Sequence, residues 1–276
     1  MTSWRQVVRD AGITQRDAEI LLLHCVEQDR AWLYSRGDEL ADEDALGRFD
    51  HCLKRRRAGE PIAYIVGKRE FWSLELEVNS SVLIPRSDTE LLVKQALIRT
   101  ENLPPRLLDL GTGSGAVALA VASEWQQRLD MTKGACVTAV DCSEDALSVA
   151  RRNAVRLGLT VEWLQSDWFS ALGGRRWPVI ASNPPYIAND DPHLSQGDLP
   201  AEPLLALASG RDGLYALRCI INEAPHYLET GGWLLLEHGW NQAHDVRQMM
   251  KSIGFQQVSS HRDLAGHERV TEGQWL

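Results

Sequence analysis

The sequence of 276 residues lacks several features that would place it in a specialised class of protein. It contains no C-x-x-C pair, and its eight histidines show no ligand spacing, so we expect no metal site. No apolar run is long enough to span a bilayer, and residues 1–10 lack the apolar core of a signal peptide, so we expect a cytoplasmic protein with no membrane partner. The five scattered cysteines are expected to be buried, reduced thiols: Cys25, Cys52, Cys136, Cys142 and Cys219.

Positive charge is also scarce, because 38 acidic residues outnumber 29 Lys and Arg residues and the formal net charge is −9. Non-specific affinity for nucleic acid rests largely on Lys and Arg, so we expect no direct nucleic-acid binding. The only dense basic run, Lys54-Arg55-Arg56-Arg57, precedes Ala58-Gly59. Cations at a helix end suit the negative pole of the helix dipole, which favours a structural role, with a local basic patch as the alternative.

The order of patterns along the chain predicts an α/β protein with a small helical N-terminal domain. Residues 1–60 show helical periodicity with a cap at Thr14, residues 61–85 suggest short strands or a connecting β-hairpin, and residues 86–276 alternate strand and helix. Alternation of this kind is typical of a parallel sheet covered on both faces. The last two strands lie too close for a covering helix and should form an antiparallel hairpin at the sheet edge. Seven strands are expected, at residues 106–110, 136–141, 161–165, 179–182, 233–237, 255–261 and 269–275.

A glycine-rich loop follows the first of these strands, where open α/β sheets bind ligands. It runs Asp109-Leu110-Gly111-Thr112-Gly113-Ser114-Gly115. The loop alone also fits a dinucleotide pattern. The spacing to the next acid, Asp141, is longer than the usual distance of about twenty residues. A carboxylate at Asp109 would repel a pyrophosphate and attract the ammonium group of S-adenosylmethionine, so methyl transfer is favoured.

Two further groups are candidates for the same cofactor. Asp141 ends the second strand, where it could accept both ribose hydroxyl protons, or else simply cap the helix that begins at Ser143. Asp167 and Trp168 follow the third strand and could hydrogen-bond and cover the adenine ring, although Trp168 could equally be a core residue.

The chemical site is expected where the fourth strand ends in Asn183-Pro184-Pro185-Tyr186. The two prolines fix the backbone and remove two N–H donors, so the turn presents carbonyl acceptors. A substrate NH₂ group could donate to the Asn183 side-chain oxygen and to the Pro184 carbonyl while Tyr186 packs against a planar amide or base. In-line placement of that nitrogen would supply much of the acceleration, and no general base is obligatory. The alternative is a proline-rich loop with an asparagine cap.

These motifs carry a resemblance to known enzymes. Residues 85–276, about two thirds of the chain, resemble a class I, Rossmann-like methyltransferase of the Asn-Pro-Pro-Tyr type. The rest resembles one branch, the peptide chain release factor glutamine methyltransferases of the PrmC/HemK family. Three segments carry this second resemblance: Gly59-Glu60-Pro61-Ile62-Ala63-Tyr64-Ile65, Glu70-Phe71-Trp72, and Leu83-Ile84-Pro85-Arg86-Ser87-Asp88-Thr89-Glu90.

The resemblance implies the acceptor, the glutamine in the Gly-Gly-Gln loop of class 1 peptide chain release factors, with S-adenosylhomocysteine as the second product. It implies that Gly111 to Gly115, Asp141, Trp168 and Asn183 contact S-adenosylmethionine, and that Asn183 to Tyr186 hold the glutamine. Two further segments resemble the substrate-side loop of the family, Asp190-Asp191-Pro192-His193-Leu194 and Glu202-Pro203. We expect a monomer.

Two departures from the family pattern stand outside the site: Ser87 replaces a usual proline, and residues 124–135 look lengthened. The ribosomal-protein glutamine methyltransferases resemble Pro-Arg-Ser-Pro-Ile where this chain has Pro85-Arg86-Ser87-Asp88-Thr89, which favours the release factor branch. Adenine amino-group methylation in nucleic acid and a non-catalytic scaffold that binds S-adenosylmethionine remain as rival hypotheses.

Overall fold

The computed structural model describes residues 2–101, 103–128 and 135–276, and within these ranges the chain divides into two compact units. One unit comprises residues 1–68 with 197–201, and the other comprises residues 69–196 with 202–276. Half of the segment that looks lengthened in the sequence, residues 129–134, lies outside the described residues.

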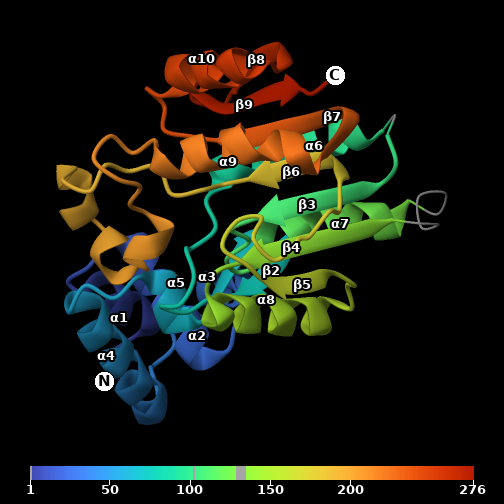
Figure 1. Ribbon diagram of the computed structural model, residues 1–276. Coiled ribbons are helices and arrows are strands. Elements are labelled where there is room, and N and C mark those ends of the chain that lie inside the picture. Colours follow the sequence, from blue (N-terminus) through green and yellow to red (C-terminus); the bar gives the residue numbers. More distant parts are fainter. Residues whose placement is uncertain (1, 102, 129–134) are drawn as a thin grey trace. The chain divides into compact units, whose positions relative to one another are not determined.

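The first unit is helical (Figure 1). Thr14 caps α2 by accepting a hydrogen bond from the Asp17 backbone N–H at 3.1 Å, as its sequence position predicts. Its core forms where the apolar faces of these helices meet, around Leu21, Leu22 and Phe49, all almost fully buried. The helices are α1 (Trp4–Arg9), α2 (Gln15–Val26), α3 (Arg30–Arg36), α4 (Glu43–Arg57) and α5 (Ile62–Val66), with the short 3₁₀ turn η3 (Leu199–Ala201).

The basic run lies in the last turn of α4, which confirms its structural interpretation. Its members are engaged within the unit: Lys54 pairs with Asp50, Arg55 with Glu60, and Arg56 with Asp17 and Asp198, while Arg57 donates to the Ala11 carbonyl oxygen.

The strand expectation at residues 62–66 is wrong, because this segment is the helix α5. A five-residue apolar run does not distinguish strand from helix by its period. The flanking residues do distinguish them, since Pro61 stands at the N-cap and Gly67 ends the helix with a φ of 77°.

The second unit contains the β-hairpin and the main sheet. The hairpin pairs β1 (Lys68–Phe71) with β2 (Leu74–Glu77), and its turn residues Trp72 and Ser73 have φ values of 52° and 59°. Two consecutive residues with positive φ match the right-handed twist of paired strands, which explains the tight two-residue connection.

The main sheet has seven strands, which confirms the predicted number and fold class. Its order is β5-β4-β3-β6-β7-β9-β8, and it is parallel except for β9, which runs antiparallel to both neighbours. The β8–β9 hairpin at the sheet edge confirms the expected end of the fold. The strands are β3 (Arg106–Leu110), β4 (Cys136–Asp141), β5 (Glu162–Gln165), β6 (Trp177–Ser182), β7 (Leu228–Glu237), β8 (Gln256–Arg262) and β9 (Glu268–Gln274).

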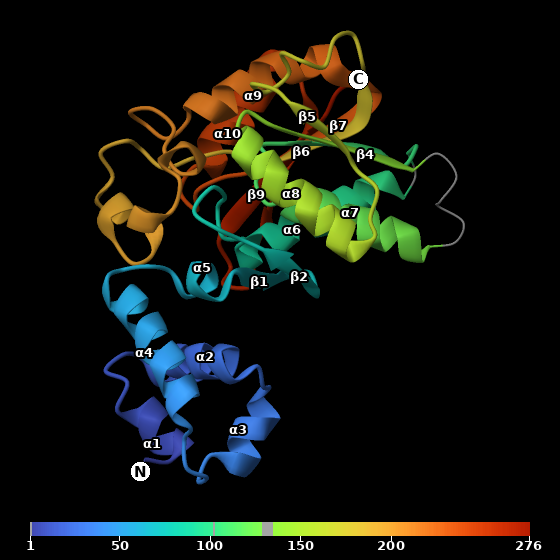
Figure 2. The same cartoon turned by 90° about the horizontal axis from the view of Figure 1, so that it is seen from below.

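Helices cover both faces of this sheet (Figure 2). Alternate residues of a strand point to opposite faces, so Leu107 packs in the core beneath α6 and α7, whereas Leu108 packs in the core beneath α9. The helix α8 begins at the cap Ser143 and ends at Gly158 (φ 66°), as predicted. The helices are α6 (Glu90–Thr100), α7 (Ala116–Gln127), α8 (Glu144–Leu157), α9 (Tyr215–Tyr227) and α10 (Ala243–Ile253), with 3₁₀ turns η1 (Ser87–Thr89), η2 (Pro192–Ser195) and η4 (Leu204–Ala206).

The expectation that all cysteines are buried is wrong for part of the set. Cys25 and Cys52 are buried with their sulfur atoms 3.7 Å apart, and Cys219 is half-buried, but Cys136 and Cys142 are exposed. Both exposed residues stand at ends of β4, where the parallel core gives way to loops.

Candidate active site

A cavity of about 320 Å³ lies at the carboxyl ends of β3, β4, β5 and β6, all within the second unit. This is the edge where open parallel sheets bind ligands, and the volume is in the range of small-molecule sites, roughly 300–1,000 Å³. Seven of the predicted site residues line it: Gly111, Gly113, Asp141, Asp167, Trp168, Asn183 and Pro185. The structure does not bring the other predicted residues into this lining: Asp109, Thr112, Ser114, Gly115, Pro184 and Tyr186.

The glycine loop follows β3 and is held tightly by its own backbone. The N–H groups of Gly111 and Thr112 both donate to the Val140 carbonyl oxygen at 2.9 Å. The N–H group of Gly113 donates to Asp141 Oδ2 at 2.9 Å. Gly111 and Gly113 have φ values of 70° and 56°, a region that residues with a Cβ rarely adopt. The loop therefore presents bare backbone to the cavity in a fixed position.

Gly115 and Ser114 connect the glycine loop to the elements packed against it. A Cβ at Gly115 would lie 2.9 Å from Leu119 Cδ1 and 3.1 Å from a ring carbon of Trp163, so only glycine fits there. The buried Asn153 of α8 donates to the Ser114 carbonyl oxygen at 3.0 Å and to the Glu77 carbonyl oxygen at 3.0 Å. Asn153 thus ties the loop to the hairpin, a role that its position inside a helical pattern did not reveal.

Asp141 accepts from the start of α8, as one of its two interpretations predicted, and it also lines the cavity, where the ribose interpretation stays a prediction. Its Oδ1 accepts from the Ser143 backbone N–H and its Oδ2 from the Gly113 N–H, each at 2.9 Å, while the residue lines the cavity. Burial raises its pKa, against these hydrogen bonds, which lower it. Each carboxylate oxygen has a second lone pair, so it can still accept a ligand hydroxyl proton.

Asp109 lies deeper than a direct ligand contact requires. It is 1% exposed, and its Oδ2 accepts from Thr112 Oγ1 at 2.6 Å and from the Ala118 N–H at 3.2 Å. Burial raises its pKa to about 7 despite these two donors. In this arrangement Asp109 holds the loop and the first turn of α7 together.

Trp168 adopts an unusual backbone conformation beside the loop, with a φ of 46°. The left-handed region costs a residue with a Cβ roughly 1–2 kcal/mol, so something must hold it there. The Ser166 hydroxyl donates to the Trp168 carbonyl oxygen at 2.8 Å. The Trp168 ring lies beside Gly111, where a Cβ on the glycine would be 3.6 Å from ring carbon Cζ3. Trp168 both borders the core and forms a wall of the cavity, whereas Asp167 beside it is exposed.

The tetrapeptide follows β6 directly, with Asn183 and Pro185 on the cavity wall and Pro184 buried. Asn183 Nδ2 donates to Thr89 Oγ1 at 3.1 Å, and Asn183 Oδ1 has no hydrogen-bond partner among the residues the structure describes. Tyr186 donates from its hydroxyl to Glu237 Oε1 at 3.4 Å.

The backbone of Tyr186 is anchored separately. Gln242 Nε2 donates to the Tyr186 carbonyl oxygen at 2.9 Å. A Cβ at Gly213 would stand only 2.4 Å from that same oxygen, so glycine is required where this loop approaches the tetrapeptide.

Glu237 ends β7 next to this group and was not expected from the sequence. It is 1% exposed, and burial raises its pKa to about 7. The hydrogen bond from the Tyr186 hydroxyl and the positive charge of Arg269 act in the opposite direction. Burial and the nearby Glu237 charge also raise the pKa of Tyr186, so its hydroxyl keeps its proton and acts as a donor.

The two segments that resemble the substrate-side loop of the family have different surroundings in the structure. Glu202 is buried, pairs with Arg86 and accepts from the Ile84 N–H at 3.0 Å, while Pro203 lines the cavity. The other segment forms η2, where Asp191 accepts from the exposed His193 at 2.7 Å.

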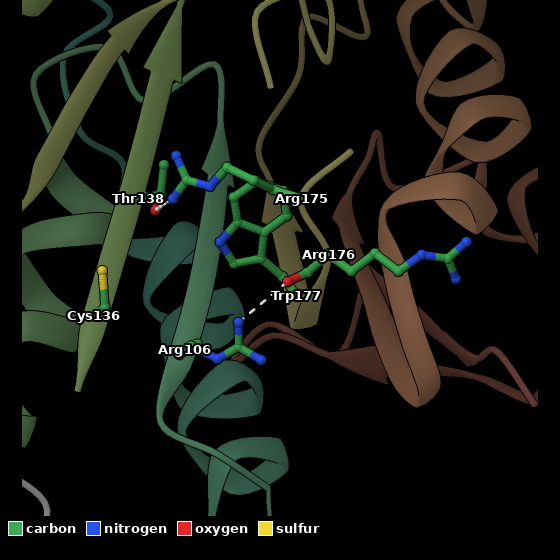
Figure 3. Close-up of a pocket in the computed structure, with 6 residues that line it drawn as sticks. All are labelled: Arg106, Cys136, Thr138, Arg175, Arg176 and Trp177. Carbon is green, nitrogen blue, oxygen red and sulfur yellow. Dashed lines mark hydrogen bonds between the residues drawn. The ribbon is translucent and has the colours of Figure 1, made fainter. Parts of the chain in front are cut away.

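A second cavity of the same unit, of about 150 Å³, lies at the amino ends of β3, β4 and β6 (Figure 3). Its arginines are already engaged: Arg106 donates to the Arg176 carbonyl oxygen, Arg175 to Thr138 Oγ1, and Arg176 to the Leu228 carbonyl oxygen. Ligands of open α/β sheets bind at the opposite, carboxyl edge, so we assign the active site to the larger cavity.

Two absences hold for residues 2–101, 103–128 and 135–276. No group of three or more His, Cys, Asp or Glu side chains there could hold a metal ion. No helix there is both long enough and apolar enough to cross a membrane.

The sheet order, the glycine loop after β3 and the tetrapeptide after β6 together define a class I methyltransferase. The fold is similar to that of a solved methyltransferase from Pyrococcus furiosus, with a TM-score of 0.52 and 18% identity, over 82% of this chain and 98% of that one. The sequence profile of the "PrmC N-terminal domain" matches residues 1–67, and that of the "Methyltransferase small domain" matches residues 87–197.

Curated relatives narrow the class to a family. The release factor glutamine methyltransferase of Vibrio cholerae is 46% identical over 261 residues, which cover 94% of this chain and 89% of the relative. The enzyme of the same name from Escherichia coli K12 is 48% identical over 262 residues, covering 95% and 92%. The chain belongs to the release factor glutamine methyltransferase family, as its motifs predicted.

Proposed function

We propose that this chain transfers a methyl group from S-adenosylmethionine to the side-chain amide nitrogen of the glutamine in the Gly-Gly-Gln motif of class 1 peptide chain release factors. One observation carries the chemistry: Asn183 stands on the wall of the cavity formed by the glycine loop, with its Oδ1 free to accept. Membership of the family carries the choice of acceptor.

The chain's own residues fit this cofactor. We infer that Asp141 would accept the two ribose hydroxyl protons, that Trp168 would cover the adenine ring, and that Gly111 and Gly113 would admit the amino acid portion against bare backbone; all four residues line the cavity. Asp109 supports the loop by accepting from Thr112. A cationic ligand at the loop would favour the ionised form of this carboxyl group. When bound, the cofactor supplies an electrophilic methyl group on a sulfonium.

The tetrapeptide is proposed to hold the acceptor. Asn183 Oδ1 and the Pro184 carbonyl oxygen would accept the two hydrogens of the glutamine NH₂ group, and the Tyr186 ring would pack against the flat amide. Holding both hydrogens leaves the nitrogen lone pair directed at the methyl group, and orientation of this kind supplies much of the rate acceleration. The product nitrogen can lose its proton after alkylation, so Asn183 need not act as a base.

The helical unit is proposed to be a substrate-recognition domain, with the hairpin as connector. It carries its own cavity of about 450 Å³, lined by Arg5, Arg9 and Arg30 together with Tyr34, which is 84% exposed. Tyr and Arg are enriched at protein interfaces. A second contact there would raise the effective concentration of the glutamine loop at the active site. Accordingly, Tyr34→Ala should raise KM for the release factor with kcat unchanged.

We further propose that the enzyme acts as a cytoplasmic monomer on protein rather than nucleic acid. The formal charge of −9 opposes binding to a phosphate backbone.

The test is methyl transfer from labelled S-adenosylmethionine to purified release factor. Label is expected on wild-type release factor and not on a variant whose Gly-Gly-Gln glutamine is replaced by alanine. Equal labelling of that variant contradicts the assigned acceptor. Salt-sensitive labelling of DNA or RNA, with release factors inert, would favour adenine methylation instead. The enzyme variant Asn183→Ala should lose label while still binding the cofactor.

A further inference from the structure

The backbone of the tetrapeptide is held at its C-terminal end by a buried side chain, that of Gln242. Gln242 is the N-cap residue of α10 and is 8% exposed. Its Nε2 donates to the Tyr186 carbonyl oxygen at 2.9 Å and to the Gly213 carbonyl oxygen at 3.4 Å. Its Oε1 accepts from the Gly239 backbone N–H at 2.8 Å. One side chain therefore joins the tetrapeptide to the loop after β7 and to the loop before α9.

The orientation of the Gln242 amide follows from the backbone groups on either side of it. A backbone N–H only donates and a carbonyl oxygen only accepts. The amide oxygen of Gln242 therefore faces Gly239, and its NH₂ group faces Tyr186. The buried His238 holds this turn, because its Nδ1 lies 2.9 Å from the Gly239 carbonyl oxygen and its Nε2 lies 2.7 Å from Thr271 Oγ1. The turn that orients the Gln242 amide is thus tied to β9.

The two prolines make the tetrapeptide depend on anchors at its ends, since Pro184 and Pro185 have no N–H group to donate. Tyr186 is held twice at its C-terminal end. Its hydroxyl donates to Glu237 Oε1 at 3.4 Å, and its carbonyl oxygen accepts from Gln242. Pro185, the residue before Tyr186, lines the cavity. A shift of the Tyr186 backbone would therefore move the cavity wall.

We propose that Gln242 is a positioning residue for methyl transfer, which fixes the Tyr186 backbone so that the tetrapeptide keeps its place against the acceptor. This inference rests on the proposed function. The packing there is tight, because a Cβ at Gly213 would lie 2.4 Å from the Tyr186 carbonyl oxygen and 2.9 Å from Gln242 Nε2. A misplacement of about 1 Å can cost roughly 100-fold in rate. Gln242 does not line the cavity, so its loss should lower kcat and leave cofactor binding intact.

The first test is Gln242→Glu, which keeps the size of the side chain and the acceptor for the Gly239 N–H. Its ionised carboxylate has no donor for the Tyr186 carbonyl oxygen. Gln248→Glu is the matched control, because it adds the same charge at an exposed position of the same helix. We expect kcat on release factor at about pH 8 to fall roughly 10- to 100-fold in Gln242→Glu and to stay near wild type in Gln248→Glu. The Kd for S-adenosylmethionine should change little in either variant, and equal kcat values for the two variants would overturn the proposal.

The pH dependence of Gln242→Glu distinguishes positioning from a merely structural role. A protonated glutamic acid has an O–H group that can donate to the Tyr186 carbonyl oxygen, as the glutamine amide does. Burial raises the pKa of a carboxyl group above its usual value of about 4.3, so mild acid should restore the bond. The ratio of variant to wild-type kcat, each expressed per cofactor-binding site so that unfolded enzyme does not count, should rise at least roughly fivefold from about pH 8 to about pH 6. Glu237 and His238 titrate in both proteins and cancel in this ratio, and a ratio that does not change with pH contradicts the positioning role.

A second variant displaces the same amide without removing it. A Cβ at Gly239 would lie 3.0 Å from Gln242 Oε1, and Gly239 has no positive φ that would oppose alanine. Gly239→Ala should therefore lower kcat, by less than Gln242→Glu does, with the cofactor Kd unchanged. If Gln242→Glu does not fold, Gly239→Ala decides alone, and wild-type kcat in that variant overturns the proposal.

The same assays separate this proposal from the proposed function. If wild-type enzyme fails to methylate release factor at all, the proposed function fails. If wild-type enzyme is active and Gln242→Glu matches its kcat at every pH, only the positioning role of Gln242 fails.

Discussion

Replacing Gly113 with alanine tests whether the cavity is built for close approach of a ligand to the loop backbone. Gly113 has a φ of 56°, and a Cβ added there would meet no atom within 4 Å. The new methyl group would therefore stand in the open space of the cavity that Gly113 lines. Gly158, at the end of α8, offers a matched control, with a φ of 66° and equally open surroundings but no place on the cavity wall.

The two substitutions should cost similar stability and differ in binding. Each places a residue with a Cβ in the left-handed region, which costs roughly 1–2 kcal/mol of unfolding free energy. At Gly113 the loop cannot retreat from a ligand without breaking its N–H bond to Asp141 Oδ2. Losing such a bond costs about 1–3 kcal/mol. That loss corresponds to a rise in Kd of roughly 5- to 150-fold.

The assay combines urea unfolding with calorimetric titration of S-adenosylmethionine. Gly113→Ala and Gly158→Ala should show comparable losses of unfolding free energy, and only Gly113→Ala should bind the cofactor more weakly. Equal cofactor Kd values for the two variants would refute the assignment of this cavity to the cofactor.

Three further outcomes follow from contacts elsewhere in the second unit. Burial would raise the pKa of Glu272, but hydrogen bonds from His261 and Arg99 lower it to about 2, against an ordinary 4.5. A carboxyl group with a lowered pKa stabilises the fold above about pH 4.5, and this stabilisation is lost as the pH falls toward 2. The free energy of unfolding of wild type, measured with urea and compared with that of Glu272→Gln, should therefore lose about 3 kcal/mol of its advantage across that window. Asp141→Asn should raise the cofactor Kd about tenfold or more in calorimetric titration, because a hydrogen bond to a charged group is worth about 1.5–3 kcal/mol. It should also lower the melting temperature, because the asparagine NH₂ group cannot accept from one of the two backbone N–H groups that Asp141 satisfies. Phe169→Ala, at a fully buried side chain, should lower the unfolding free energy by about 3–5 kcal/mol, measured with urea.

Local signals in the sequence were sufficient to predict most helices and strands of the second unit. Ser143 and Gly158 bound a helix because a hydroxyl at the N-cap and a glycine with positive φ at the end satisfy backbone groups that belong to that helix alone. The buried strands are continuous apolar runs for an equally local reason, since both faces of a parallel sheet are covered. Where local signals conflicted, as at residues 62–66, the apolar run was mistaken for a strand.

The surroundings of Asn183 could not be predicted in the same way. Thr89 reaches Asn183 only because the chain folds residues far apart in sequence onto one edge of the sheet. Glu237 left a weaker signal, an acid directly after the apolar run Leu234-Leu235-Leu236. The same reasoning that singled out Asp141 at the end of β4 applies to it, because the carboxyl ends of parallel strands share one edge.

Asp109 and Glu237 show that this edge is not arranged for stability. Burial raises the pKa of each to about 7, against ordinary values of 3.8 and 4.5. A carboxyl group whose folded pKa lies above its unfolded value destabilises the fold increasingly as the pH rises from the unfolded pKa to the folded one, by about 3–4 kcal/mol per group at the upper end. Neutral side chains at these positions would therefore fold at least as well near pH 8. The contacts of the two carboxylates belong to the site instead: Asp109 accepts from Thr112 of the glycine loop, and Glu237 accepts from the Tyr186 hydroxyl of the tetrapeptide.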